Sequence, residues 1–253
     1  SGINVTTGSD NTAVGGNALD NETTGGNNTA IGVAALGANT TGAQNIAVGG
    51  GAMQLNTTGS DNCSFGFGSM GNASNTGSGR NNAFGYESLQ SLTTGTQNQA
   101  MGFQAGTNLT TGSYNNIMGA EAMENSTTAT GCIAIGHDAL RNNDANYITG
   151  VGYGVLTQNT TGIENTAVGA SALDANTTGN HNTALGHNAL TANTTAQYNT
   201  AVGRNALSAN VTGQYNTAIG MDALENNTAS NNTACGLRAL ESNTTGGNNT
   251  SVG

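Results

Sequence analysis

The 253-residue chain contains no proline and no tryptophan, and only 7% of its residues are charged and 4% aromatic. A globular core built from large aromatic side chains is therefore not expected. The missing prolines exclude collagen, and low charge without proline is unlike most disordered chains. No segment approaches the roughly 18 to 20 consecutive apolar residues that cross a bilayer, so we expect no membrane insertion by this segment.

Basic residues are few. The chain has 14 acidic and 4 basic residues and a net charge of −10. Nucleic-acid affinity depends on clustered Lys and Arg that neutralise phosphates, and anionic membrane surfaces attract the same clusters. The four basic residues are isolated along the chain: Arg80, Arg141, Arg204 and Arg238. Neither nucleic acid nor an anionic membrane surface is expected as a partner.

Glycine is abundant, with 40 residues, and it marks an internal repeat. The phrase Asn-Thr-Ala-Val-Gly at 165–169 is followed by Ala-Leu at 172–173 and Asn-Thr-Thr-Gly at 176–179, and it recurs along the chain. The glycine that follows the apolar residue, Gly169 in this unit, is called the marker glycine. It returns in steps of 17 residues, with one step of 19 and two of 16. We predict a single array over 1–253 of about fifteen units, with register breaks near 71–80 and 142–147.

A 17-residue unit is too short for a helical-hairpin repeat or a propeller blade, and Gly, Asn and Thr are poor helix formers. Each unit has one apolar residue before the marker glycine and another five residues later. We expect both apolar columns in the continuous core of an all-β parallel β-solenoid. The first column includes Val14, Ile31, Val48, Ile135, Val168, Leu185, Val202 and Ile219. The second includes Leu19, Leu36, Leu140, Leu173, Leu190, Leu207, Leu224 and Leu240.

Polar and small residues also repeat with the coil. The Asn before each Thr-Ala, such as Asn165, is expected to form an amide ladder at the 4.7 to 4.9 Å spacing of stacked strands. Two glycines per unit, such as Gly169 and Gly179, are expected to turn corners with positive φ. Ala167 and Ala172 either permit a tight interior or form a flat wall against another chain.

Two large apolar residues per unit are too few to offset the conformational entropy lost when a whole unit becomes ordered. Ladder hydrogen bonds and contacts with further copies must supply the remainder. The sequence therefore predicts an oligomer.

The repeated phrase, from about Asn11 to Gly253, resembles the head repeats of YadA-type trimeric autotransporter adhesins. It is still more similar to the repeat arrays of phage tail fibres and related bacterial fibres. In these families, left-handed parallel β-rolls from three chains associate side by side and carry surface attachment. The resemblance implies a homotrimeric fibre at a cell surface or on a virion, and an unknown surface receptor for which a glycan is one candidate.

No catalytic constellation is found, and we predict no enzyme, no cofactor and no metal site. His137, His181 and His187 are expected to be isolated surface residues. Asp174 and Glu225 are three units apart, too far for the paired carboxylates of a glycosidase. These two belong to a set of carboxylates after the Leu column, expected on a solvated edge, with Asp20, Glu124 and Glu241.

The three cysteines are four and six units apart. Cys63, Cys132 and Cys235 are therefore too distant for an intrachain disulfide, which needs Cα atoms within roughly 7 Å. Cys235 occupies the first apolar column, so we expect it to be a small core residue.

The Asn-Thr-Thr-Gly corner has three interpretations. It is favoured turn chemistry, a column of N-glycosylation acceptors, or a Thr and Asn array that orders water as an ice-binding face. The register breaks argue against a long ice-binding lattice. The alternatives to an adhesive fibre are thus an ice-binding β-solenoid and an architectural, glycosylated filament subunit. The candidate acceptors are Asn39, Asn56, Asn159, Asn176, Asn193, Asn210 and Asn243.

Overall fold

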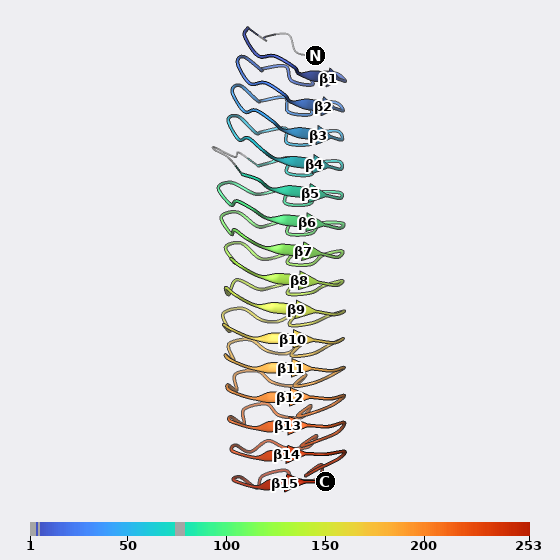
Figure 1. The fold of residues 1–253 in the computed structure, drawn as a ribbon, viewed down its shortest axis with the longest axis vertical. Helices are drawn as coiled ribbons and strands as arrows, with labels where there is room; N and C mark the ends of the chain where they lie inside the picture. Colours follow the sequence, from blue (N-terminus) through green and yellow to red (C-terminus); the bar gives the residue numbers. More distant parts are fainter. Residues whose placement is uncertain (1–3, 5, 74–78) are drawn as a thin grey trace. The chain divides into compact units, whose positions relative to one another are not determined.

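The chain is an all-β parallel β-solenoid built from short coils, each corresponding to one sequence repeat (Figure 1). The computed structural model describes residue 4, residues 6–73 and residues 79–253. These residues form two compact units, 1–131 and 132–253. None of the described residues belongs to a helix that is long and apolar enough to cross a membrane.

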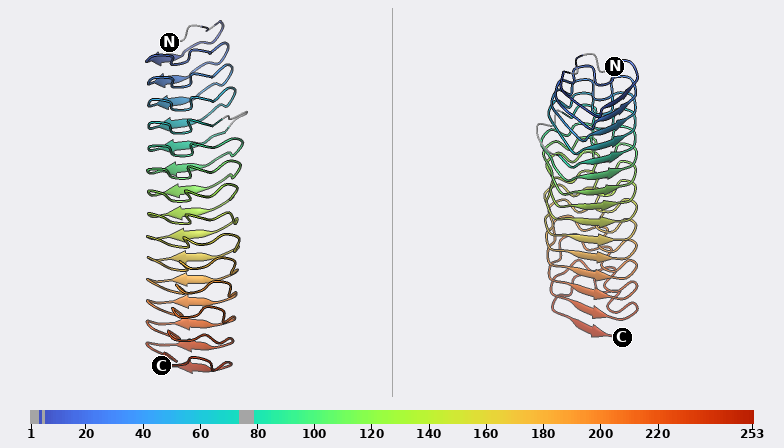
Figure 2. Two further views of the ribbon diagram at one scale, coloured as in Figure 1. Left: turned by 180° about the vertical axis from the view of Figure 1, so that it is seen from behind. Right: turned by 45° about the horizontal axis from the view of Figure 1, so that its top comes forward.

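Unit 1 is a stack of coils, each with one three-residue strand (Figures 1 and 2). Its strands are β1 (Thr12–Val14), β2 (Thr29–Ile31), β3 (Ile46–Val48), β4 (Cys63–Phe65), β5 (Asn82–Phe84), β6 (Gln99–Met101) and β7 (Asn116–Met118). Each strand pairs in parallel with the next, and equivalent residues of successive coils lie opposite each other, as Val14 does with Ile31. This register places the repeat's residues in columns.

Unit 2 repeats the same arrangement. Its strands are β8 (Ile133–Ile135), β9 (Thr149–Val151), β10 (Thr166–Val168), β11 (Thr183–Leu185), β12 (Thr200–Val202), β13 (Thr217–Ile219), β14 (Thr233–Cys235) and β15 (Thr250–Val252). The short step near 142–147 leaves the pairing intact, because Ile133 still lies opposite Thr149. The expected break near 71–80 falls partly on residues 74–78, outside the described residues, and beyond it Asn82 pairs in register with Cys63.

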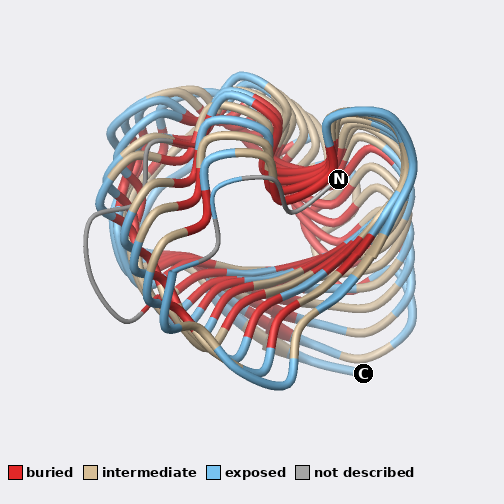
Figure 3. Ribbon diagram, turned by 90° about the horizontal axis from the view of Figure 1, so that it is seen from above, coloured by how far each residue is buried: buried red, intermediate tan, exposed pale blue. Residues whose placement is uncertain are grey.

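The interior is narrow and is filled mainly by alanine, leucine and asparagine. Ala167, Ala172 and Leu173 are all fully buried, and buried residues stack in columns from coil to coil (Figure 3). Ala167 and Ala172 therefore form the tight interior. The predicted Leu column is confirmed at Leu19, Leu36, Leu140, Leu173, Leu190, Leu207 and Leu224. Leu240 is half-buried.

The column before the marker glycine is not in the core, and that prediction was wrong. Side chains alternate along a strand, so the central residue of each strand, which is usually Ala, points inward and its two neighbours point outward. Val14 is 56% exposed and Leu185 47%. Ile31, Ile135 and Ile219 are exposed as well. Val48, Val168 and Val202 are half-buried.

The two predicted turn glycines differ in their roles. Gly169 has a φ of 132°, as expected. Gly179 is not among the residues with positive φ; in its coil Leu173 and His181 adopt left-handed values of 52° and 56°. A Cβ at Gly179 would lie 2.4 Å from the carbonyl oxygen of Ala196 in the next coil. Glycine is therefore required at position 179 because the next coil lies too close for a side chain, and not because of the backbone φ.

The predicted asparagine ladder is present. In unit 1, Nδ2 of Asn98 donates to Oδ1 of Asn81 at 3.2 Å and to the carbonyl of Gly112 at 2.9 Å. In unit 2, Oδ1 of Asn165 accepts the backbone N–H of Asn182 at 2.9 Å. These bonds satisfy buried amides that would otherwise destabilise a polar interior.

Candidate functional site

The most regular exposed feature is the outer side of the strands. In unit 2, the third residue of each strand from β8 to β15 points outward, and so does the first. We call these residues the Thr–aliphatic face. The first residues are Ile133, Thr149, Thr166, Thr183, Thr200, Thr217, Thr233 and Thr250. The third residues are Ile135, Val151, Val168, Leu185, Val202, Ile219, Cys235 and Val252.

The Thr–aliphatic face carries no charged side chain, although the chain has a net charge of −10. β-Branched residues dominate it, and they pack well on a pleated surface. Its apolar members are exposed or half-buried, with Leu185 and Ile219 at 47% and 44% exposure. Contiguous exposed apolar surface is the kind of surface through which proteins commonly interact, so this face is a candidate interaction surface.

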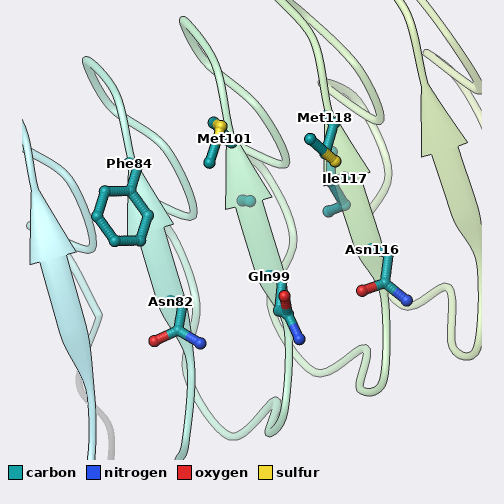
Figure 4. Close-up of a pocket in the computed structure, with 8 residues that line it drawn as sticks. Asn82, Phe84, Gln99, Met101, Asn116, Ile117 and Met118 are labelled. Carbon is teal, nitrogen blue, oxygen red and sulfur yellow. The ribbon is translucent and has the colours of Figure 1, made fainter.

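The outer side of unit 1 changes character along the stack. From β1 to β3 it resembles unit 2, with Thr12 and Val14 on the first strand. On β5 to β7 the first residue is an amide and the third is bulky and apolar. These residues line a surface hollow of about 390 Å³, which we call the amide–apolar hollow (Figure 4). It is lined by Asn82, Phe84, Gln99, Ala100, Met101, Asn116, Ile117 and Met118.

Aromatic rings stack from coil to coil beside this hollow. The Phe65 and Phe84 rings lie 5.2 Å apart and nearly parallel. Tyr86 stacks between Phe67 and Phe103 at 5.8 and 5.4 Å. Near-parallel aromatic pairs at these distances stabilise the stack of coils. A hydrogen bond to Glu87 raises the pKa of Tyr86.

A second ladder occurs in unit 2. Tyr198 stacks between His181 and Tyr215, with ring centroids 4.9 and 5.2 Å apart. Nδ1 of His181 also lies 3.2 Å from Oε2 of Glu164. In another coil of this unit, Nδ1 of His137 lies 2.9 Å from Oδ2 of Asp138. These two histidines thus have separate acidic partners.

The predicted solvated edge is only partly exposed. All five carboxylates after the Leu column are half-buried: Asp20, Glu124, Asp174, Glu225 and Glu241. Their positions recur with the coil, as the Leu column does. His187 is exposed, on a different coil from His137 and His181.

The corner asparagines form a second interior ladder, which the sequence did not identify. Nδ2 of Asn193 donates to Oδ1 of Asn176 at 2.8 Å and to the carbonyl of Ala196 at 3.2 Å. A glycan acceptor must present this nitrogen to solvent, so the glycosylation prediction was wrong at the fully buried positions. These are Asn39, Asn56, Asn159, Asn176, Asn193 and Asn210.

The remaining candidate acceptor is also engaged. Asn243 is half-buried, and its Nδ2 donates to Oδ1 of Asn227 and to the carbonyl of Gly246, both at 2.8 Å. The corner threonines are used in the same way, since Oγ1 of Thr177 donates to the carbonyl of Thr194 at 3.1 Å. The corner is therefore built from internal hydrogen bonds, which favours the structural interpretation.

The cysteines are free, and they differ in exposure. Cys132 is buried, and desolvation raises the pKa of its thiol. Cys63 is half-buried, and burial raises its pKa too. Cys235 is exposed on the Thr–aliphatic face, so the expectation that it belongs to the core was wrong, for the same reason of strand alternation.

The chain was compared with known protein families, sequences and structures. No family model, curated protein sequence or solved structure matches the chain.

Proposed function

We propose that the chain is a segment of an extracellular homotrimeric fibre, without catalytic activity, that spaces and presents repeated surfaces for attachment. The observation that carries this proposal is the uncharged Thr–aliphatic face, which continues over the successive strands β8 to β15 of unit 2. Apolar area removed from water there would stabilise association at about 25 cal/mol per Å² before the costs of binding.

A second copy of the chain is the partner that fits this face best. Two copies with the same repeat can match coil for coil, and cyclic symmetry brings the same columns together. Between two acidic chains, a face without charge avoids like-charge repulsion. The number of copies and the extracellular site come from the resemblance to adhesin heads and tail fibres.

Attachment would depend on many weak contacts. A fibre that displays the same surface at each coil and on each copy raises the effective concentration of its binding groups. Avidity then replaces a single deep site.

Cross-linking at Cys235 tests the association. Sheets packed face to face lie about 10 Å apart, beyond a disulfide's reach but within that of a short bis-maleimide. When two copies lie parallel and in register, their Cys235 residues lie at the same height along the solenoid. In a Cys63→Ser background, we expect a denaturing gel to show a product with twice the mass of the 25.0 kDa chain.

The control is the Cys63→Ser, Cys235→Ser double variant, in which only the buried Cys132 remains. It should give no such product. If bis-maleimide yields only single chains in both proteins, or cross-links both equally, the copies do not meet on this face.

A further inference from the structure

We propose that the amide–apolar hollow on β5–β7 binds a neutral glycan. Asn82, Gln99 and Asn116 lie opposite one another in register, and their amides project from the outer side of the sheet (Figure 4). Within the described part of the chain, these three amides make no side-chain hydrogen bond. Three aligned amides are thus left to bind a ligand.

The first strand residues that line the hollow differ from the usual repeat residue in three successive coils. In unit 2, the matching position is Thr on every strand from β9 to β15. Thr favours strands, whereas Asn is depleted in them. The longer amides therefore lower local strand preference without a compensating bond inside the protein. Departures of this kind are expected at functional sites.

The third strand positions form an apolar surface beside the amides. Phe84, Met101 and Met118 are 37%, 51% and 44% exposed, and they project from the same side of the sheet as the amides (Figure 4). Methionine side chains adapt their shape to a ligand. This surface suits the C–H face of a sugar ring.

The chemistry of the lining selects the ligand class. A side-chain amide both donates and accepts hydrogen bonds, as does each sugar hydroxyl. No lining residue is charged, and the chain's net charge of −10 disfavours sialylated or uronic-acid sugars. A volume of about 390 Å³ lies in the usual range of small-ligand sites, roughly 300 to 1,000 Å³.

This inference rests on the attachment role proposed above and names the surface that performs it. A second copy is a poorer occupant of the hollow than a glycan. Burying three amides without partners costs about 1 to 3 kcal/mol each, whereas the Thr–aliphatic face offers flat apolar packing. Self-association and ligand binding would thus use different surfaces.

The test replaces the three amides with the residue found at their position in unit 2. The Asn82→Thr, Gln99→Thr, Asn116→Thr variant and the unmodified protein are titrated calorimetrically with mannohexaose, cellohexaose, maltohexaose and chitohexaose, with sialyllactose as the anionic comparison. We expect the unmodified protein to bind at least one neutral hexasaccharide more tightly than sialyllactose. The variant should bind it at least about ten-fold more weakly, as for the loss of one or two hydrogen bonds.

A matched control removes an exposed amide elsewhere. Gln158→Thr, in unit 2, should bind the sugar like the unmodified protein, and all three proteins should share one circular-dichroism spectrum and one molar mass. The inference is overturned if the unmodified protein binds none of the neutral sugars, or if the triple variant binds as tightly. It is also overturned if the triple variant loses molar mass, because a second copy then occupies the hollow. Sugar binding by a single-chain protein would refute the fibre and leave this site standing.

Discussion

Replacing Val202 and Ile219 with aspartate is expected to convert an assembly with three times the mass of the 25.0 kDa chain into single chains. Both side chains lie on the Thr–aliphatic face, and Ile219 is 44% exposed. Aspartate at these positions would place carboxylates where the copies meet, and burying a charge without a partner is strongly unfavourable. Light scattering after size-exclusion chromatography would measure the change.

The single chains should remain folded, because neither substitution enters the interior. Circular dichroism should therefore keep its sheet signal. A matched variant is Val211→Asp, which changes a valine of similar exposure (39%) at the corner of the coil. It should retain the mass of the unmodified protein. Assembly of the Val202→Asp, Ile219→Asp variant at full mass would exclude this face as the contact.

Gly186→Ala is expected to destabilise the solenoid by about 3 kcal/mol or more, because strained backbone costs roughly 1 to 3 kcal/mol and a steric clash adds to it. Gly186 has a φ of 141°. An added Cβ would lie 2.5 Å from the carbonyl oxygen of Gly203 in the next coil. Since coils are stabilised by their neighbours, the strain affects two coils. The urea midpoint followed by circular dichroism should fall clearly.

Gly16→Ala provides the comparison, because nothing lies within 4 Å of a Cβ built at Gly16 and its φ is not positive. Its unfolding midpoint should match that of the unmodified protein, as for most surface substitutions. Equal midpoints for Gly186→Ala and Gly16→Ala would mean that successive coils do not approach each other as closely as the structure requires.

The 17-residue period was sufficient to predict the parallel solenoid, the interior Leu column and one asparagine ladder. It could not decide which side of each strand faces inward, because Val168 and Ala167 repeat with the same period. The larger side chain of the strand is not the buried one, because the third strand residue points outward and the smaller central residue points inward. The informative signal is variation, since the inward position is Ala in most strands while its outward neighbour ranges from Val to Phe.

The corner asparagines were misassigned for a related reason. An Asn-x-Thr sequence is compatible both with an exposed acceptor and with a buried ladder, and only the contacts of Nδ2 distinguish them. The amide–apolar hollow has a signal in the sequence, because Asn82, Gln99 and Asn116 stand where most other units have Thr. Its concavity depends on side-chain shape, which the repeat pattern does not contain.

The outward apolar column also changes the argument for association. The sequence predicted an oligomer because burial within one coil appeared too small. With that column outside, each typical coil buries one large apolar side chain and two alanines, such as Leu173, Ala167 and Ala172. Under the proposed association, the exposed column would bury further apolar area where copies meet.

Sedimentation equilibrium of the unmodified protein over a range of concentrations tests this account most directly. Three chains meeting through their Thr–aliphatic faces predict a molar mass three times the 25.0 kDa of one chain. A mass of 25.0 kDa at every concentration would contradict the account, because the uncharged apolar face would then remain in contact with water.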